Sequence, residues 1–123
     1  MENKKILIVE DEAPIAEMYK TQLELAGFEV MLARDGYEGL IRAVKEQPHL
    51  ILLDIVMPRL NGWQTLKQLR DLEETKDLII CILSNLDNQP EVKRGLEAGA
   101  DYYFSKTAFT PGELLLQLQQ LPA

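Results

Sequence analysis

The chain has 123 residues, of which 46% are apolar and 27% charged, and a formal net charge of −7. This length fits one domain with its own core, and the composition excludes a disordered chain. The negative charge disfavours non-specific nucleic-acid binding, and a single cysteine, Cys81, excludes an internal disulfide. Because the sequence shows neither a signal-peptide pattern nor a run long enough for a transmembrane helix, we expect a cytoplasmic protein with no membrane partner.

Short apolar runs alternate with helical patterns along the chain. Residues 5–9 form an apolar run before an acidic triplet, and Pro14 suits the first turn of a helix that ends at Gly27. Residues 28–33 then predict a second strand, and Pro48 ends the helix that follows it. Both helices are indicated by apolar residues at helical spacing, which are Ile15, Met18, Tyr19 and Leu23 in the first and Tyr37, Leu40, Ile41 and Val44 in the second.

The second half of the chain continues the alternation. Residues 50–53 are apolar throughout, which is typical of a parallel strand covered on both faces. A loop over 58–62 and a third helix precede a strand at 78–83 and a helix that starts near Asn88 and ends at Gly99. After a fifth strand at 102–104, the residues Thr110-Pro-Gly-Glu113 have the form of a capping box for a last helix to about residue 121. Five β-α units predict an α/β fold, with a doubly wound parallel sheet and helices on both faces.

Polar side chains follow several of these predicted strands. Ligands bind at the carboxyl ends of the strands in open sheets of this kind, and parallel connections bring those ends to one edge. The residues concerned are Glu10 and Asp11 after the first strand, Asp54 after the third, Ser84 after the fourth and Lys106 after the fifth. Crowded carboxylates without nearby histidine or cysteine favour Mg²⁺, with the Lys106 ammonium as a further cation.

Asp54 is the candidate reactive group. A carboxylate beside magnesium and a lysine can act as a nucleophile toward phosphorus, and Ser84 offers a hydroxyl donor to a phosphoryl oxygen. Taken singly, an aspartate after a strand is an ordinary turn or cap residue, and a single serine or lysine is ordinarily solvated. The combination at one predicted edge is what favours a phosphoryl-transfer site.

The chain resembles the receiver domain of two-component response regulators over essentially its whole length. The motifs that carry this resemblance are Lys5-Ile-Leu-Ile-Val-Glu-Asp-Glu12, Leu52-Leu-Asp-Ile-Val-Met-Pro58 with Asn61-Gly62, Ile82-Leu-Ser84 and Gly99-Ala-Asp-Tyr-Tyr-Phe-Ser-Lys106. The resemblance implies a flavodoxin-like sheet of order 2-1-3-4-5. It also implies a single receiver domain over residues 1–123, and we expect no output domain in this chain.

The resemblance also implies a function and residue roles. The family is a phosphorylation-activated signalling switch rather than a conventional enzyme, although self-catalysed phosphorylation from small donors and autodephosphorylation belong to it. A partner histidine kinase or phosphotransfer protein would phosphorylate Asp54 and so change the face of the fourth helix, fifth strand and fifth helix, which controls a downstream partner, an output domain or a homodimer. The implied residues are Glu10, Asp11, Asp54 and the carbonyl of Val56 for Mg²⁺, Lys106 for phosphate contact, Ser84 as the switch hydroxyl and Tyr103 as the aromatic that turns inward.

Three departures from the family pattern bear on this site. Thr107 stands where the family has a proline in a cis peptide, so this bond is either trans with a different loop or cis under strain. Asn85 replaces a smaller residue, and its bulk is expected to slow access of the phosphodonor. Val56 and Leu86 are apolar residues beside the site, where they predict a modified phosphoryl lifetime.

Other interpretations stay open from the sequence. A phosphorylation-independent scaffold is one, and a magnesium-dependent aspartyl phosphatase is another, although residue 56 lacks the second acid of an Asp-x-Asp motif. A nucleotide or flavin site is disfavoured because no glycine-rich phosphate loop follows the first strand. We expect His49 on the surface, Trp63 in packing, and Leu116 exposed on the last helix as a possible partner or dimer contact.

Overall fold

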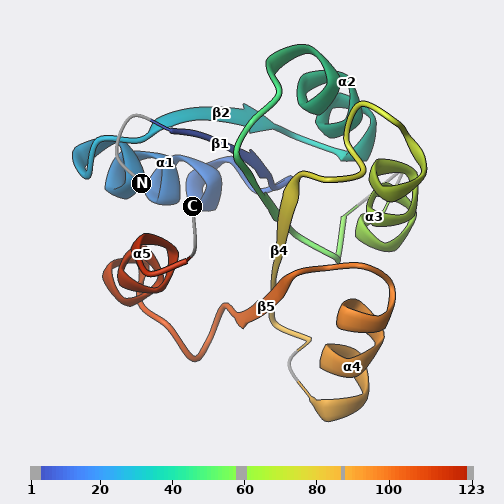
Figure 1. Cartoon of the computed structure of the whole chain (residues 1–123). Helices are drawn as coiled ribbons and strands as arrows, with labels where there is room; N and C mark the ends of the chain where they lie inside the picture. Colours follow the sequence, from blue (N-terminus) through green and yellow to red (C-terminus); the bar gives the residue numbers. More distant parts are fainter. Residues whose placement is uncertain (1–3, 58–60, 87, 122–123) are drawn as a thin grey trace.

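A computed structural model of the chain describes residues 4–57, 61–86 and 88–121, and it contains one five-stranded parallel sheet (Figure 1). The strand order is β2-β1-β3-β4-β5, which confirms the predicted doubly wound, flavodoxin-like topology. The strands are β1 (Lys5–Val9), β2 (Glu29–Ala33), β3 (Leu50–Leu53), β4 (Ile79–Ser84) and β5 (Tyr102–Ser105). The helices are α1 (Ala13–Leu25), α2 (Gly36–Glu46), α3 (Gly62–Asp71), α4 (Gln89–Glu97) and α5 (Pro111–Gln119).

The helices form two layers, with α1 and α5 on one face of the sheet and α2, α3 and α4 on the other (Figure 1). Each helix layer covers a separate hydrophobic cluster, because alternate residues of each strand point to opposite faces of the sheet. All four residues of β3 are buried, as the continuous apolar run predicts for a central parallel strand. The single cysteine, Cys81, is fully buried within this core, in agreement with its apolar surroundings in the sequence.

Polar caps fix where several helices begin. Thr110 and Glu113 form the predicted capping box of α5, in which each side chain accepts the other residue's backbone N–H. A second capping box joins Asn61 and Gln64 at the start of α3, where the sequence predicts the end of a loop. Residues 58–60 of that predicted loop, including Pro58, lie outside the described residues.

Helix α2 packs on the sheet through small residues and not through its apolar stripe. The apolar stripe that predicts this helix is largely exposed, with Ile41 the most accessible of its residues at 67%. The face that α2 buries consists of Gly36, Gly39 and Ala43. Small residues are required there because the helix lies close to β1: a Cβ added at Gly39 would come within 3.0 Å of a methyl group of Val9.

Arg70, at the carboxyl end of α3, connects the loops at the amino-terminal edge of β4 and β5. Its guanidinium donates to the carbonyl oxygens of Gly99, Lys76 and Leu78, at 2.7–2.8 Å, and forms a 2.9 Å ion pair with Asp101. The same carboxylate oxygen accepts a backbone N–H of β4. These contacts hold the loops before β4 and β5, and thus the strands that lead to Ser84 and Lys106.

Within the described part of the chain, none of the helices combines the length and apolar character that crossing a membrane requires.

Candidate functional site

The carboxyl ends of the strands bring the predicted polar residues together. Backbone hydrogen bonds continue the sheet one residue beyond the strands: Glu10 N–H donates to the Ala33 carbonyl, Asp54 N–H to the Val9 carbonyl, and Lys106 N–H to the Ser84 carbonyl. Because each functional residue takes part in this extended ladder, the positions of their Cα atoms follow from strand pairing. The predicted juxtaposition of these strand ends is therefore confirmed.

Lys106 lies between two buried carboxylates. Its Nζ atom is 2.5 Å from Glu10 Oε1 and 3.3 Å from Asp54 Oδ2. Glu10 is 3% exposed and Asp54 is 6% exposed, whereas Asp11 is on the surface. One carboxylate oxygen from each of the three acidic residues lies within 4.8 Å of the others. One ammonium thus contacts two of three clustered carboxylates.

The pKa values reflect this imbalance. Burial and the negative charge of Glu10 raise the pKa of Asp54 to about 7, against the opposing effect of Lys106. Burial is the largest single effect on Glu10 and disfavours its ionised form, but the hydrogen bond and the charge of Lys106, together with the Glu12 N–H, outweigh it and lower the Glu10 pKa. Burial and Glu10 raise the pKa of Asp11. The repulsion from Glu10 that Lys106 does not offset therefore contributes to the raised pKa of Asp54.

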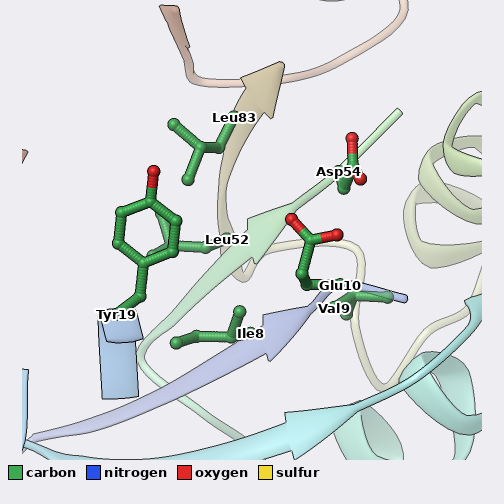
Figure 2. A pocket seen from close by; sticks show the side chains of 7 residues that line it. All are labelled: Ile8, Val9, Glu10, Tyr19, Leu52, Asp54 and Leu83. Carbon is green, nitrogen blue, oxygen red and sulfur yellow. The ribbon is translucent and has the colours of Figure 1, made fainter. Parts of the chain in front are cut away.

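The side chains beside Glu10 and Asp54 on the α1 side of the sheet are mainly apolar. In Figure 2 the two carboxylates stand at the ends of β1 and β3, while Tyr19 from α1 lies to one side of them together with the apolar side chains of Leu52 and Leu83. Apolar surroundings strengthen electrostatic interactions and penalise uncompensated charge. These apolar neighbours contribute to the burial that raises the Asp54 pKa.

The residues at this edge fit a hard divalent cation. The donors are three clustered carboxylates, without histidine or cysteine among the described residues of the cluster, which suits Mg²⁺ rather than a softer metal. A cation would offset the excess negative charge that raises the Asp54 pKa. The backbone N–H of Val56 donates to Asp54 Oδ1 at 3.2 Å, so the loop that carries the expected carbonyl ligand is held against the carboxylate.

A cleft of about 350 Å³ opens over Asp54, lined also by Asp11, Val56, Asn85 and Lys106. Val56 is 61% exposed at its margin. Asn85 is exposed and lines the same cleft, and its effect on access of the phosphodonor stays a prediction. The cleft leads from the surface of the domain to Asp54.

The main chain of Leu86 connects Ser84 with Tyr103. Ser84 is fully buried, and its Oγ accepts the Leu86 N–H at 3.0 Å. The Tyr103 hydroxyl donates to the Leu86 carbonyl, and its ring packs so closely on α4 that a Cβ at Gly95 would come within 2.7 Å of it. Sequence reasoning missed this link because it runs through backbone atoms, which residue identity does not reveal.

The turn after Lys106 resolves the question raised by Thr107. No cis peptide bond occurs among the described residues, so the Lys106–Thr107 bond is trans. The Ser105 hydroxyl oxygen accepts the N–H groups of Thr107 and Ala108, both at 3.2 Å, and lies 3.0 Å from the Thr107 hydroxyl. A serine-centred turn thus forms the loop here. Serine hydroxyls commonly bond to the backbone N–H groups of residues that follow them in turns, so Ser105 is the residue from which this turn could have been predicted.

The remaining sequence expectations concern surface and packing. His49 is exposed, and its Nδ1 accepts the Lys5 N–H at 3.0 Å. Trp63 packs under the Arg94 guanidinium, whose central carbon is 4.0 Å from the ring centroid. Leu116 is 56% exposed on α5. The surface position of His49, the packing of Trp63 and the exposure of Leu116 are confirmed, while a partner contact at Leu116 stays a prediction.

The fold and the acidic site at the strand ends define a doubly wound α/β protein with a candidate metal site, and comparison with known proteins gives its family. The model of the response regulator receiver domain matches residues 6–119. The chain belongs to this family, the receiver domains of two-component response regulators.

Individual relatives agree with this assignment. The chain is 41% identical over 112 residues to the alkaline phosphatase synthesis transcriptional regulatory protein PhoP of Bacillus subtilis, a match that covers 91% of this chain and 45% of that protein. It is 35% identical to the DNA-binding dual master transcriptional regulator RpaA of Synechocystis, over 95% of this chain and 48% of that protein. The chain thus spans about half the length of these curated relatives.

Solved structures resemble the whole chain. The chemotaxis protein CheY4 of Vibrio cholerae superposes with a TM-score of 0.89 at 32% identity, covering 98% of this chain and 99% of that one. The receiver domain of the Francisella response regulator 1452 gives a TM-score of 0.86 at 33% identity, over 95% and 94% of the two chains.

Proposed function

We propose that Asp54 accepts a phosphoryl group and that this modification switches the surface of the domain. The observation that carries the proposal is the placement of a buried carboxylate, with a pKa raised to about 7, against Lys106 and beneath an open cleft. An ionised oxygen of Asp54 would attack the phosphorus of a donor, and the donor's leaving group would depart with the electrons of the broken bond. A histidine kinase or phosphotransfer protein is the expected donor, as in the family.

The surrounding residues have separate roles in this reaction. Glu10, Asp11, Asp54 and the Val56 carbonyl would hold Mg²⁺, which supplies positive charge to the transferring phosphoryl oxygens when bound. Lys106 would provide a second positive group, because its Nζ atom lies 3.3 Å from Asp54 Oδ2. Glu10 holds the Lys106 ammonium in place through its 2.5 Å contact. In this arrangement Glu10 acts on the lysine as well as on the metal.

The hydrogen bonds around Leu86 provide a path from Asp54 to the surface. A phosphoryl group adds negative charge and acceptor oxygens, which would attract the Ser84 hydroxyl. Ser84 Oγ accepts the Leu86 N–H, and the Tyr103 hydroxyl donates to the Leu86 carbonyl. Movement of the serine hydroxyl would therefore shift the main chain of Leu86 and, with it, the Tyr103 hydroxyl. Tyr103 packs on Gly95 of α4, so the change extends to the face of α4, β5 and α5.

This face is the proposed contact for a downstream protein, an output domain or a second copy. The named relatives are transcriptional regulators, and this chain corresponds to about half of each. We propose that the 123 residues act as one receiver domain with no direct nucleic-acid contact of their own. Val56, Asn85 and Leu86 line the cleft and are expected to set the phosphoryl lifetime through access of water and donor.

Intact-mass measurement tests the proposal. The chain is incubated with acetyl phosphate, with and without Mg²⁺, and separately with phosphohistidine-bearing kinase domains. One added phosphoryl group is expected, dependent on Mg²⁺, absent from Asp54→Asn and retained in Asp77→Asn, which changes an exposed carboxylate. Absence of uptake from every donor would contradict the proposal and favour a phosphorylation-independent scaffold.

A further inference from the structure

Helix α2 presents an apolar stripe to solvent. Tyr37 is 52% exposed, Ile41 67% and Val44 37%, and the helix packs on the sheet through its small residues instead. Apolar residues therefore continue from the buried side of α2 onto its outer side. Contiguous exposed apolar surface of this kind is characteristic of interaction sites, whereas scattered single residues are not.

A hollow lies beside the most exposed of these residues. It has a volume of about 430 Å³ and is lined by Leu40, Ile41, Val44, Lys45 and, from the segment after α3, Leu72. Almost all of its lining is apolar side chain, and Ile41 stands at its margin with two thirds of its surface accessible. A projecting side chain and a hollow thus occupy the same face. Such a face is complementary to a second copy of itself.

The charges beside the stripe are arranged in the same self-complementary way. Glu38 and Lys45 are seven residues apart, two helical turns, and so lie along the same flank of α2. Tyr37 and Val44 have the same spacing within the stripe, and Ile41 lies midway. Glu38 makes a 3.4 Å ion pair with the exposed Arg34, while Lys45 has no ion pair among the residues that the structure describes. The flank therefore carries a negative charge at one end and an available positive charge at the other.

We propose that two copies of this chain associate through antiparallel α2 helices, around a two-fold axis at Ile41. In this arrangement each Glu38 meets the Lys45 of the other copy, and each Tyr37 meets a Val44. The two Ile41 side chains meet near the axis, beside the two hollows. A parallel arrangement would instead place like charges together, so the charge pattern selects the antiparallel pair.

This surface is separate from the phosphorylation switch. Helix α2 lies at the β2-β1 side of its layer, whereas α4 lies at the β5 side (Figure 1). Association through α2 therefore occurs without phosphorylation and leaves the α4, β5 and α5 face accessible. A contact made by one helix and its neighbouring turn belongs to the small, transient class of interfaces, for which a dissociation constant of about 10–100 µM is expected.

Sedimentation equilibrium of the unphosphorylated chain, from about 5 to about 500 µM, tests the proposal. A monomer–dimer equilibrium is expected, and Ile41→Lys should raise its dissociation constant about tenfold or more because the substitution counts twice in a two-fold interface. Leu25→Lys at the carboxyl end of α1 is the matched control, because this leucine is 80% exposed and belongs to neither proposed contact face, and it should leave the constant unchanged. Leu116→Lys on α5 reports separately on association through the α4, β5 and α5 face. Circular dichroism establishes that each variant is folded.

A charge exchange tests the antiparallel geometry. Glu38→Lys and Lys45→Glu should each raise the dissociation constant about threefold to tenfold, since each places like charges opposite one another. The double variant, which exchanges the two charges, should restore dimerisation to within about twofold of the original chain. A monomer at every concentration, loss of dimer in Leu116→Lys but not Ile41→Lys, or a double variant weaker than both single variants would overturn the proposal.

Discussion

Two clusters of charged side chains lie at opposite edges of the sheet, and they are built differently. At the amino-terminal edge, Arg70 makes one ion pair and three further hydrogen bonds, so its charge and its donors are matched by acceptors. At the carboxyl-terminal edge, Lys106 faces Glu10 and Asp54, with Asp11 nearby, and negative charge is in excess. The first cluster holds loops together. The second leaves a carboxylate with a raised pKa below a cleft.

The Arg70 cluster thus stabilises the fold, whereas the Lys106 cluster provides the proposed reactive carboxylate of the same small domain. A fully paired buried group resists change, because every alternative leaves donors or acceptors unsatisfied. A crowded carboxylate is destabilising in the absence of a cation, and it gains most when a metal or phosphoryl group arrives. Substitutions at the two edges should therefore have opposite effects on folding and on phosphorylation.

The largest expected effect on stability is at Arg70. Arg70→Ala removes four hydrogen bonds and leaves the Asp101 carboxylate without its cation, so we expect a loss of about 2–4 kcal/mol in unfolding free energy. Urea denaturation measures this loss. The folded variant should still take up a phosphoryl group in the presence of Mg²⁺. Lys67→Ala, which breaks an exposed ion pair with Asp71, is the control and should cost less than about 0.5 kcal/mol.

Magnesium should stabilise the chain through the opposite edge. At a concentration one hundred times its dissociation constant, a ligand of the native state adds about 2.7 kcal/mol to the unfolding free energy. Denaturation with and without Mg²⁺ should show an increase of this order in the original chain and a much smaller one in Asp11→Asn. An equal increase in both would show that the stabilising ion binds elsewhere.

Asp54→Asn should stabilise the metal-free chain in a pH-dependent way. The carboxyl group releases its proton near pH 3.8 in the unfolded chain and near pH 7 in the folded one. Between these values the native state binds more protons, so the contribution of Asp54 to stability falls as the pH rises from about 4 to about 7. The variant should be more stable than the original chain at pH 8, by at least about 1 kcal/mol, and should differ from it little at pH 4. A variant less stable than the original at pH 8 would contradict the account.

The smallest expected effect is at Ser105. Ser105→Ala removes the acceptor of two backbone N–H groups in the turn after Lys106, which should cost about 1 kcal/mol and slow phosphoryl uptake by displacing the lysine. Ser105→Thr keeps the hydroxyl and should restore most of both properties. Uptake by Ser105→Ala at the original rate would separate this turn from the position of Lys106.

Much of the fold could be predicted from the sequence, because it rests on local signals. The uninterrupted apolar run of β3 and the Thr110 capping box both specify structure within a few residues. The meeting of Asp54 and Lys106 followed from the topology of parallel strands. In α2 the apolar stripe predicted the helix correctly but did not reveal its buried face, which consists of Gly36, Gly39 and Ala43 because β1 lies so close.

The contacts that sequence reasoning could not supply depend on distant or backbone partners. Arg70 and Asp101 come together only when α3, β4 and β5 are all in place. The Leu86 link between Ser84 and Tyr103 depends on main-chain atoms and on the path of one loop. The family resemblance implies the roles of Ser84 and Tyr103, and the three-dimensional arrangement supplies the contacts through which they would act.

The most direct test of the central claim is a carbon NMR titration of the Asp54 carboxyl group, with and without Mg²⁺. The account predicts a midpoint near pH 7 in the metal-free chain, because burial and Glu10 oppose ionisation, and a lower midpoint when Mg²⁺ is bound. A metal-free midpoint near 3.8, unmoved by Mg²⁺, would show that the carboxylates at this edge are not crowded and would contradict the account.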